Sequence, residues 1–219
     1  MTRRSSYFAI EIDAPQLKYM KLKDYRSDKI VLKNLGSLAM IDIATEYSSP
    51  LGPMKRVIIT DFLISVSSVK HMIISQLTLE IIFRYSKRIP KFDNLYHLQA
   101  VFSSSMIHLL PIFLESCPNL KDLILDYYFD GARETELTSV SQCLLSTLEC
   151  VEIKELLIKE ETWKKLARYF LENSVLLKKL ILRFNDFSIA NQDSDIFQEL
   201  CTFTKPSQEC QIIIHRQCH

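Results

Sequence analysis

Leu120-Lys-Asp-Leu123-Ile-Leu125 and Leu177-Lys-Lys-Leu180-Ile-Leu182 repeat one pattern of apolar residues at two distant places in the chain. In both segments the second apolar residue comes three positions after the first, and another follows two positions later. Side chains two apart on a β-strand point to the same side. The pattern therefore predicts a short strand whose last two apolar side chains turn inward.

The same spacing recurs in five further segments. The seven units begin at Leu17, Leu38, Val69, Leu95, Leu120, Leu148 and Leu177. Their separations scatter about the roughly 20 to 29 residues that are typical of leucine-rich repeats. A single unit cannot cover its own apolar face, so several units must stack to close a core. The pair Ile10 and Ile12, ahead of the first unit, reads as the strand of a partial unit.

Helices are predicted between the strands. In residues 162–172 the side chains of Trp163, Leu166 and Phe170 follow the helical period, and basic residues occupy the opposite face. Other helices are expected at residues 54–64, 78–86 and 105–116, where Pro111 should kink the helix or delay its start. A last helix around Ile196, capped by Asp193 or Ser194, and a strand at residues 210–214 would close the array.

These observations predict an α/β fold, namely a leucine-rich-repeat solenoid that is right-handed and curved. A parallel sheet of about seven or eight short strands would form the concave side, with helices on the convex side. We expect the apolar positions of the clearest units to be buried, namely residues 17, 20, 22, 120, 123, 125, 177, 180 and 182.

Composition argues against several classes of function. The formal charge is only +1 over 219 residues, so no net field attracts phosphate backbones or anionic membranes. The 3 glycines are isolated, and no phosphate-binding glycine loop can be written. The 6 cysteines form no CxxC pair, which favours reduced thiols and an intracellular protein, cytoplasmic or nuclear. We expect no cofactor, no nucleic-acid partner and no membrane partner.

Several longer strings resemble a known family. Cys117-Pro-Asn-Leu-Lys-Asp-Leu-Ile-Leu125 and Ala14-Pro-Gln-Leu-Lys-Tyr-Met-Lys-Leu22 look like repeats of the plant F-box/leucine-rich-repeat proteins. Leu144-Leu-Ser-Thr-Leu-Glu-Cys-Val-Glu-Ile153, the segment at residues 169–180 and Cys210-Gln-Ile-Ile-Ile214 resemble the FBD domain of that family. The resemblance implies a repeat segment at residues 1–142 and FBD-like repeats with a cap at residues 143–219.

The resemblance also implies a role in protein binding. In such proteins an F-box docks a Skp-type adaptor of a cullin ubiquitin ligase, and the repeats select the substrate. The stretch before Leu17 is shorter than an F-box, so we expect no direct adaptor binding by this chain. The expected function is therefore substrate recognition by a module that is not an enzyme. A truncated decoy or relic is the main alternative, and a small cysteine or serine hydrolase is a remote one.

The expected partner surface consists of strand residues that alternate with the inward pair and point out of the concave face. Its partner would be a protein that the sequence does not identify. The candidate residues are Lys21, Lys23, Asp42, His71, His97, Gln99, Asp122, Asp126, Glu152, Lys179 and Arg183. Their charge runs from basic through acidic at Asp122, Asp126 and Glu152 to basic again. An ordinary solvated sheet face is the alternative interpretation.

Two chemical sites were weighed against simpler interpretations. Cys210, His215, Cys218 and His219 carry zinc-type ligands, but their spacing matches no standard finger, so an ordinary chain end is favoured. A cysteine nucleophile would need a neighbouring base and an oxyanion donor, whereas Cys117, Cys143 and Cys150 lie at structural positions of the repeats. His71 and His97 occupy the same position in consecutive units, and no orienting carboxylate is indicated for either. We therefore expect neither a catalytic nor a metal site.

Overall fold

The structure is a computed structural model, and it describes residues 9–23, 29–44, 55–86, 88–131, 136–157, 161–185 and 193–216. The chain divides into two compact units, Met1–Leu95 and Tyr96–His219, which we call unit 1 and unit 2. Each unit is an α/β structure built on parallel strands with helices, as predicted. Among the described residues, no helix is long and apolar enough to cross a bilayer.

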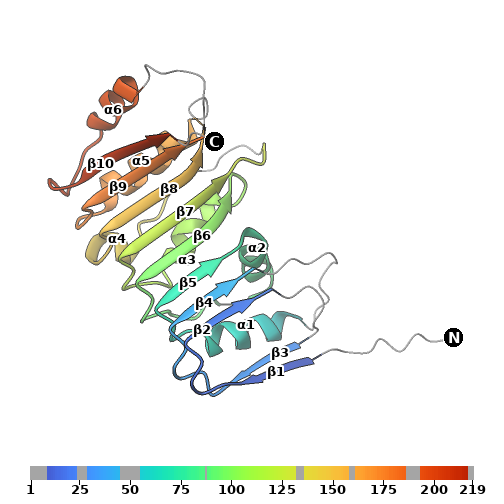
Figure 1. The fold of residues 1–219 in the computed structure, drawn as a ribbon. Coiled ribbons are helices and arrows are strands. Elements are labelled where there is room, and N and C mark those ends of the chain that lie inside the picture. Colours follow the sequence, from blue (N-terminus) through green and yellow to red (C-terminus); the bar gives the residue numbers. More distant parts are fainter. Residues whose placement is uncertain are drawn as a thin grey trace. The chain divides into compact units, whose positions relative to one another are not determined.

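Unit 1 contains two groups of parallel strands and two helices (Figure 1). Strand β2 pairs with β4 and β4 with β5, while β1 pairs with β3 in a separate two-stranded sheet. Helix α1 packs against β3 and α2. The bounds are β1 Ala9–Asp13, β2 Tyr19–Leu22, β3 Lys29–Lys33, β4 Met40–Ile43, α1 Lys55–Ser65, β5 His71–Ile74 and α2 Gln76–Tyr85.

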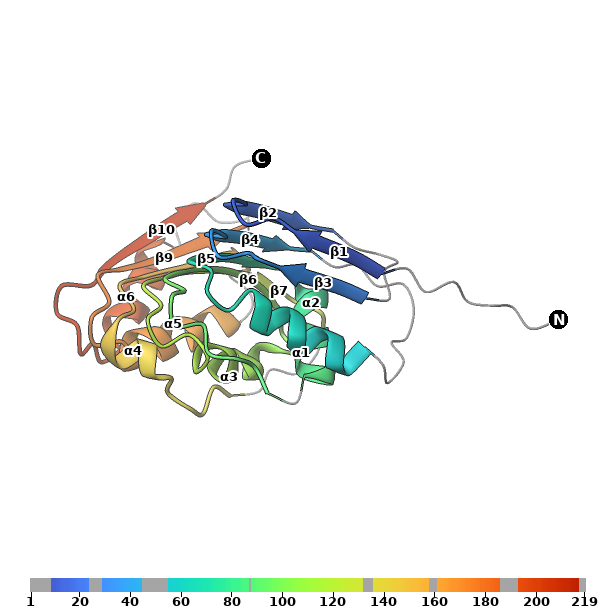
Figure 2. The same cartoon turned by 90° about the horizontal axis from the view of Figure 1, so that it is seen from below.

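Unit 2 is a five-stranded parallel sheet in the order β6-β7-β8-β9-β10. Helices α3, α4, α5 and α6 lie on one side of this sheet (Figure 2). The bounds are β6 His97–Ser103, η1 Ile107–Leu109, α3 Leu110–Leu114, β7 Asp122–Tyr128, α4 Gln142–Ser146, β8 Cys150–Leu156, α5 Thr162–Asn173, β9 Lys179–Phe184, α6 Asp193–Cys201 and β10 Gln211–Arg216. The other side of the sheet is the one we call the open face.

The apolar positions of the repeated pattern meet in register across the strands of each unit. In unit 2, Leu123 of β7 pairs with Leu98 of β6 and with Val151 of β8, and Val151 pairs with Leu180 of β9. In unit 1 the corresponding row is Met20, Ile41 and Met72. All of these side chains are buried, so the spacing that was read from the sequence does set the core.

Helix α5 covers the sheet of unit 2 with a strongly apolar side. Trp163 is 2% exposed, and its ring meets that of Phe184 edge to face at a centroid distance of 5.6 Å. Phe170, two helical turns after Trp163, is fully buried. Burial of large rings of this kind dominates the stability of a small core.

Two expectations need correction, and a third is confirmed. Leu17 is half-buried rather than buried, because it lies just before β2, which among the described strands pairs only with β4. Ile10 and Ile12 do lie in a strand, but β1 pairs with β3, a strand that the repeat pattern did not predict. The helix expected at residues 105–116 starts late, as predicted for Pro111: a 3-10 turn precedes the short helix α3, and Pro111 lies in the first turn of that helix.

Candidate functional site

The open face of unit 2 is built by simple alternation along each strand. In β6, β7, β8 and β9 the residues of the repeated pattern are buried, and the residues between them are partly or fully exposed. Register places the outward residues in three rows across the sheet. The first row is His97, Asp122, Cys150, Lys179 and Gln211, and the second is Gln99, Ile124, Glu152, Ile181 and Ile213. The third row is interrupted by a register shift between β8 and β9, so that Val101, Asp126 and Lys154 are register neighbours on one side of the shift and Arg183 and His215 on the other.

The acidic residues in the middle of the open face are paired with side chains of neighbouring strands. Asp126 accepts a hydrogen bond from the Gln99 side chain at 2.8 Å and lies 3.8 Å from the Lys154 ammonium. Glu152 accepts a hydrogen bond from the Arg183 guanidinium. The acidic band that the sequence predicted is therefore part of a ladder of alternating charges. Such a ladder offers a partner much less net field than three unpaired carboxylates would.

The first row carries two more exposed charges, one on β7 and one on β9. The side chain of Asp122 is 46% exposed, and its carboxylate lies 4.0 Å from Nδ1 of His97. Lys179 is exposed on β9. Between them lies the half-buried Cys150, whose pKa is raised by burial and further by the charge of Asp122. The row thus changes from acidic at β7 to basic at β9.

The candidate residues of unit 1 form one ion pair. Lys21 and Asp42 are register neighbours on β2 and β4, and their charged atoms lie 2.6 Å apart. The hydrogen bond to Asp42 raises the pKa of Lys21. Lys23 is exposed just after β2, and His71 is half-buried on β5. His71 belongs to unit 1 and His97 to unit 2, so the two histidines are described separately.

The cysteines show the surroundings of structural thiols. Cys117 and Cys143 are buried, and their Sγ atoms donate to the carbonyl oxygens of Phe113 and Leu114 at 3.6 Å and 3.9 Å. Burial raises the pKa of Cys143 to about 12, which keeps its thiol protonated at neutral pH. Cys150, Cys201 and Cys210 are also free thiols. This agrees with the prediction of reduced cysteines for the described residues.

The zinc-type residues near the end of the chain lie only partly within the described residues. Cys210 is half-buried ahead of β10 and His215 is exposed on that strand, whereas Cys218 and His219 lie outside the described ranges. Within those ranges, no group of three or more His, Cys, Asp and Glu residues is placed to hold a metal ion. The structure therefore offers no described site at which a bound metal would supply chemistry.

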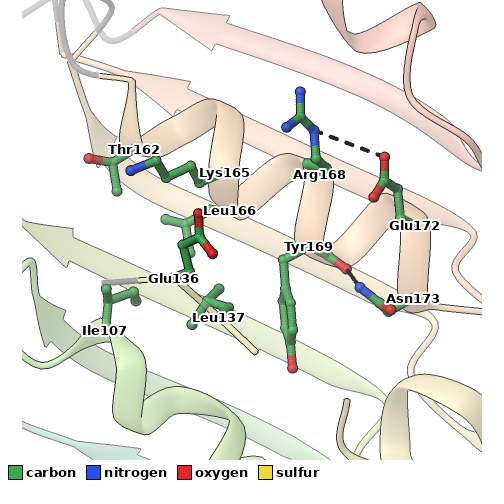
Figure 3. Close-up of a pocket in the computed structure, with 10 residues that line it drawn as sticks. All are labelled: Ile107, Glu136, Leu137, Thr162, Lys165, Leu166, Arg168, Tyr169, Glu172 and Asn173. Atoms are coloured by element: carbon green, nitrogen blue, oxygen red, sulfur yellow. Dashed lines mark hydrogen bonds and ion pairs between the residues drawn. The ribbon is translucent and has the colours of Figure 1, made fainter. Parts of the chain in front are cut away.

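A hollow of about 250 Å³ lies beside α5, on the helix side of unit 2 (Figure 3). Arg168 and Glu172 on its rim lie 3.9 Å apart, and the Asn173 amide donates to the Tyr169 carbonyl at 2.8 Å. The Tyr169 hydroxyl donates to the Ser139 carbonyl, and burial raises the pKa of this tyrosine to about 12. The rim therefore carries paired charges and bonded polar groups rather than a set of reactive ones.

The sequence did not point to this hollow or to all of the open face. The hollow depends on Glu136 and Leu137, which belong to a loop without a repeated pattern. Gln211, Ile213 and His215 complete the rows of the open face but were not among the expected site residues. Their signal was present, because Ile212 and Ile214 continue the inward spacing and fix which residues of the closing strand point outward.

Comparison with known proteins connects the chain with one group of plant proteins. The FBD family matches residues 135–182, which contain α4, β8, α5 and most of β9. An F-box/FBD/LRR-repeat protein of Arabidopsis thaliana is 59% identical over 95% of this chain and 50% of the relative. A putative F-box/FBD/LRR-repeat protein of the same plant is 56% identical over 96% of this chain and 51% of the relative.

A third Arabidopsis thaliana relative, an FBD-associated F-box protein, is 49% identical over 94% of this chain and 47% of the relative. The chain thus spans about half the length of the curated relatives it matches. No solved structure matches the chain. The boundary at residue 142 that the sequence suggested stays a prediction.

Proposed function

This chain is related to the F-box/FBD/LRR-repeat proteins and carries the FBD segment, and on that premise we propose that it is a protein-binding leucine-rich-repeat module. It would correspond to the substrate-recognition half of a cullin-ligase receptor and would not be an enzyme. It would act inside the cell, in keeping with the free thiols of the described residues. Its ligand would be another protein, bound on the open face.

Repetition of one structural unit supports the leucine-rich-repeat part of this proposal. Within each compact unit, the strands that carry the repeated pattern pair in parallel with their neighbours, and the apolar positions of successive repeats fall on the same register rows. Each strand is followed by a connecting segment, and most of these segments contain a helix. Stacking of identical supersecondary units is the principle of a solenoid, so we propose this architecture for the array.

The observation that carries the binding proposal is the composition of the open face in unit 2. Apolar residues Ile124, Ile181 and Ile213 lie half-buried in the middle row, where Glu152 between the first two is paired with Arg183. The charges of the first and third rows lie on either side. Interfaces between proteins combine an apolar centre with a polar rim in the same way. A sheet face of this kind suits a macromolecular partner better than a small substrate, because small substrates are held in concave pockets.

The charges at Asp122 and Lys179 allow a specific test. We expect Asp122→Lys combined with Lys179→Glu to reduce partner capture by at least about tenfold, because like charges brought together across an interface cost several kcal/mol. Arg168→Glu combined with Glu172→Lys is the matched control, since it also exchanges one acid and one base and lies on α5. Asp126 and Glu152 are left intact because their reversal would break ion pairs of the sheet itself.

The measurement is affinity capture from plant extract with the parent chain and both variants, followed by quantitative mass spectrometry. Circular dichroism and thermal unfolding confirm that each variant is folded. Proteins that the parent and control retain and the open-face variant loses are the expected ligands. A folded open-face variant that captures every parent ligand undiminished would refute the assignment. Recovery of a cullin-ligase subunit together with a ligand would favour the receptor over the decoy.

A further inference from the structure

Strand β10 forms one edge of the sheet in unit 2 (Figure 1). Among the described strands it pairs only with β9, in parallel and in register over its whole length. Its inward residues Ile212 and Ile214 are half-buried, whereas their register partners Leu180 and Leu182 on β9 are fully buried. The inward apolar side chains are therefore only partly covered at this edge of the sheet.

The backbone groups of β10 that face away from β9 follow from its hydrogen bonding. The amide of Gln211 donates to the Lys178 carbonyl at 2.9 Å, so the amide of Gln211 faces β9. Backbone groups alternate in direction along a strand. The N–H and C=O groups of Ile212 and Ile214 consequently face the outer edge, where they are available to pair with a further strand.

Natural sheets usually protect an edge with charges, proline or a bulge. Residues 211–215 of β10 include no proline and no residue with a full charge at neutral pH, so that the strand carries a full charge only at its last residue, Arg216, and the pairing with β9 continues without a register shift. The interior strand β8, by contrast, does contain such a shift. The edge at β10 is thus chemically suited to strand addition, and its half-buried isoleucines would gain burial from it.

We propose that β10 is a self-association surface, at which it pairs antiparallel with β10 of a second copy of this chain across a two-fold axis at Ile213. The sequence Gln211-Ile-Ile-Ile-His215 has the same polarity in both directions around Ile213. Antiparallel pairing centred there places Ile213 opposite its own copy, Ile212 opposite Ile214 and Gln211 opposite His215. Isoleucine meets isoleucine, and no two full charges of the same sign face each other.

A second copy fits this edge better than an extended segment of another protein. Two-fold symmetry uses one surface twice, so that surface has to be complementary to itself. The near-palindromic, uncharged segment at residues 211–215 meets that requirement. It would also join the outer-edge amide and carbonyl of Ile212 in one copy to those of Ile214 in the other, as in an antiparallel ladder. Ile213 also belongs to the middle row of the open face, but this inference concerns backbone pairing at the edge and is tested by self-association, whereas the proposed function is tested by capture of another protein.

The test is the oligomeric state of the complete chain, measured by sedimentation velocity over a wide concentration range. We expect the parent to form a dimer and Ile213→Lys to weaken dimerisation by at least about tenfold, since a charge would face its own copy at the axis. Ile181→Lys is the matched control, because Ile181 has the same position in its strand but lies on β9. It should leave self-association unchanged.

Mixing provides a second readout that loss of folding cannot imitate. Ile213→Lys and Ile213→Glu should each be largely monomeric alone and should form a mixed dimer when combined, because opposite charges then meet at the axis. In the parent chain, hydrogen exchange at the amides of Ile212 and Ile214 should slow as the dimer forms with rising concentration. This measurement requires no variant.

Each other result overturns the proposal. A parent chain that stays monomeric throughout the concentration range shows that the edge does not self-associate. A dimer that survives Ile213→Lys, or that Ile181→Lys disrupts equally, shows association through another surface. Failure of the two oppositely charged variants to form a mixed dimer excludes the two-fold pairing at Ile213. None of these results bears on partner capture by the open face, so the two proposals fail separately.

Discussion

Cys143 and Cys201 illustrate how the surroundings of a single residue decide its chemistry. Both are free thiols on helices of unit 2, but Cys143 is fully buried on α4 and Cys201 is exposed at the end of α6. Burial disfavours the thiolate and raises the pKa of Cys143 to about 12. The thiolate is the reactive form, so reactivity should follow these surroundings rather than the position of the residue in the repeat.

We therefore expect iodoacetamide at pH 8 to alkylate Cys201 rapidly in the native protein and to leave Cys143 unmodified. At that pH, well below a pKa of about 12, almost no Cys143 is ionised. Peptide mapping by mass spectrometry measures each site separately, including Cys218, which lies outside the described residues. Denatured protein, in which both thiols should react, is the control. Rapid native labelling of Cys143 would contradict the burial of α4.

At the residue scale, alternation along the strands predicted the outward direction of Asp126 and Glu152 but not which side chains they pair with, and Asp42, which was expected on the partner surface, is buried. Alternation alone placed Asp126 and Glu152 on the open face, because the side-chain period of a strand is two. Their partners Gln99, Lys154 and Arg183 lie on neighbouring strands more than twenty positions away in sequence. Such pairs depend on register, which the repeats suggested, and on rotamers, which no sequence pattern specifies.

At the scale of single elements, long periodic segments were predicted well and short ones poorly. Helix α5 matches the expected range because its apolar period extends over three turns. Helix α4, with 5 residues, was not predicted, since it is too short to show a period. The register shift in β8 was also missed. Glu155 adopts a positive φ of 62° there, a conformation set by the tertiary structure rather than by the preference of glutamate.

The best-predicted element also gives the clearest prediction of stability. Trp163→Ala should lower the free energy of unfolding by about 3–5 kcal/mol, because it removes a buried ring together with its edge-to-face contact with Phe184. Glu172→Ala on the same helix is the control. It breaks only the exposed ion pair with Arg168 and should change stability by less than about 0.5 kcal/mol.

Urea unfolding followed by far-UV circular dichroism measures both variants of α5 against the parent chain. A similar urea dependence of the free energy in all three proteins would show that the comparison is between equivalent transitions. A loss of less than about 1 kcal/mol for Trp163→Ala would mean that the ring is not packed in the core as described.

At the scale of the whole molecule, the sequence predicted the kind of structure more firmly than its subdivision. Parallel strands and in-register apolar rows follow from one repeated spacing, which made them readable without coordinates. The division after Leu95 had no such signal, because the sequence repeat that begins at Leu95 fits the spacing as well as the neighbouring repeats do. The separate pairing of β1 with β3 could not be predicted for a related reason, since β3 carries no copy of the repeated pattern.

The division predicts that unit 2 folds without unit 1. A fragment of residues 96–219 keeps all five strands of its sheet, the helices that cover one side, and the fully buried side chains of Phe102, Phe113 and Phe170. We expect it to give a folded far-UV spectrum and a single cooperative thermal transition, because strands β7, β8 and β9 keep both of their neighbours. A fragment of residues 96–178 is the control. It lacks β9 and β10, which leaves Val151 and Ile153 of β8 without their register partners on β9 and Trp163 without Phe184. That loss of burial should prevent cooperative folding. If the longer fragment is unfolded as well, unit 1 supplies part of the core of unit 2, and the division at Leu95 does not mark an independently stable part of the molecule.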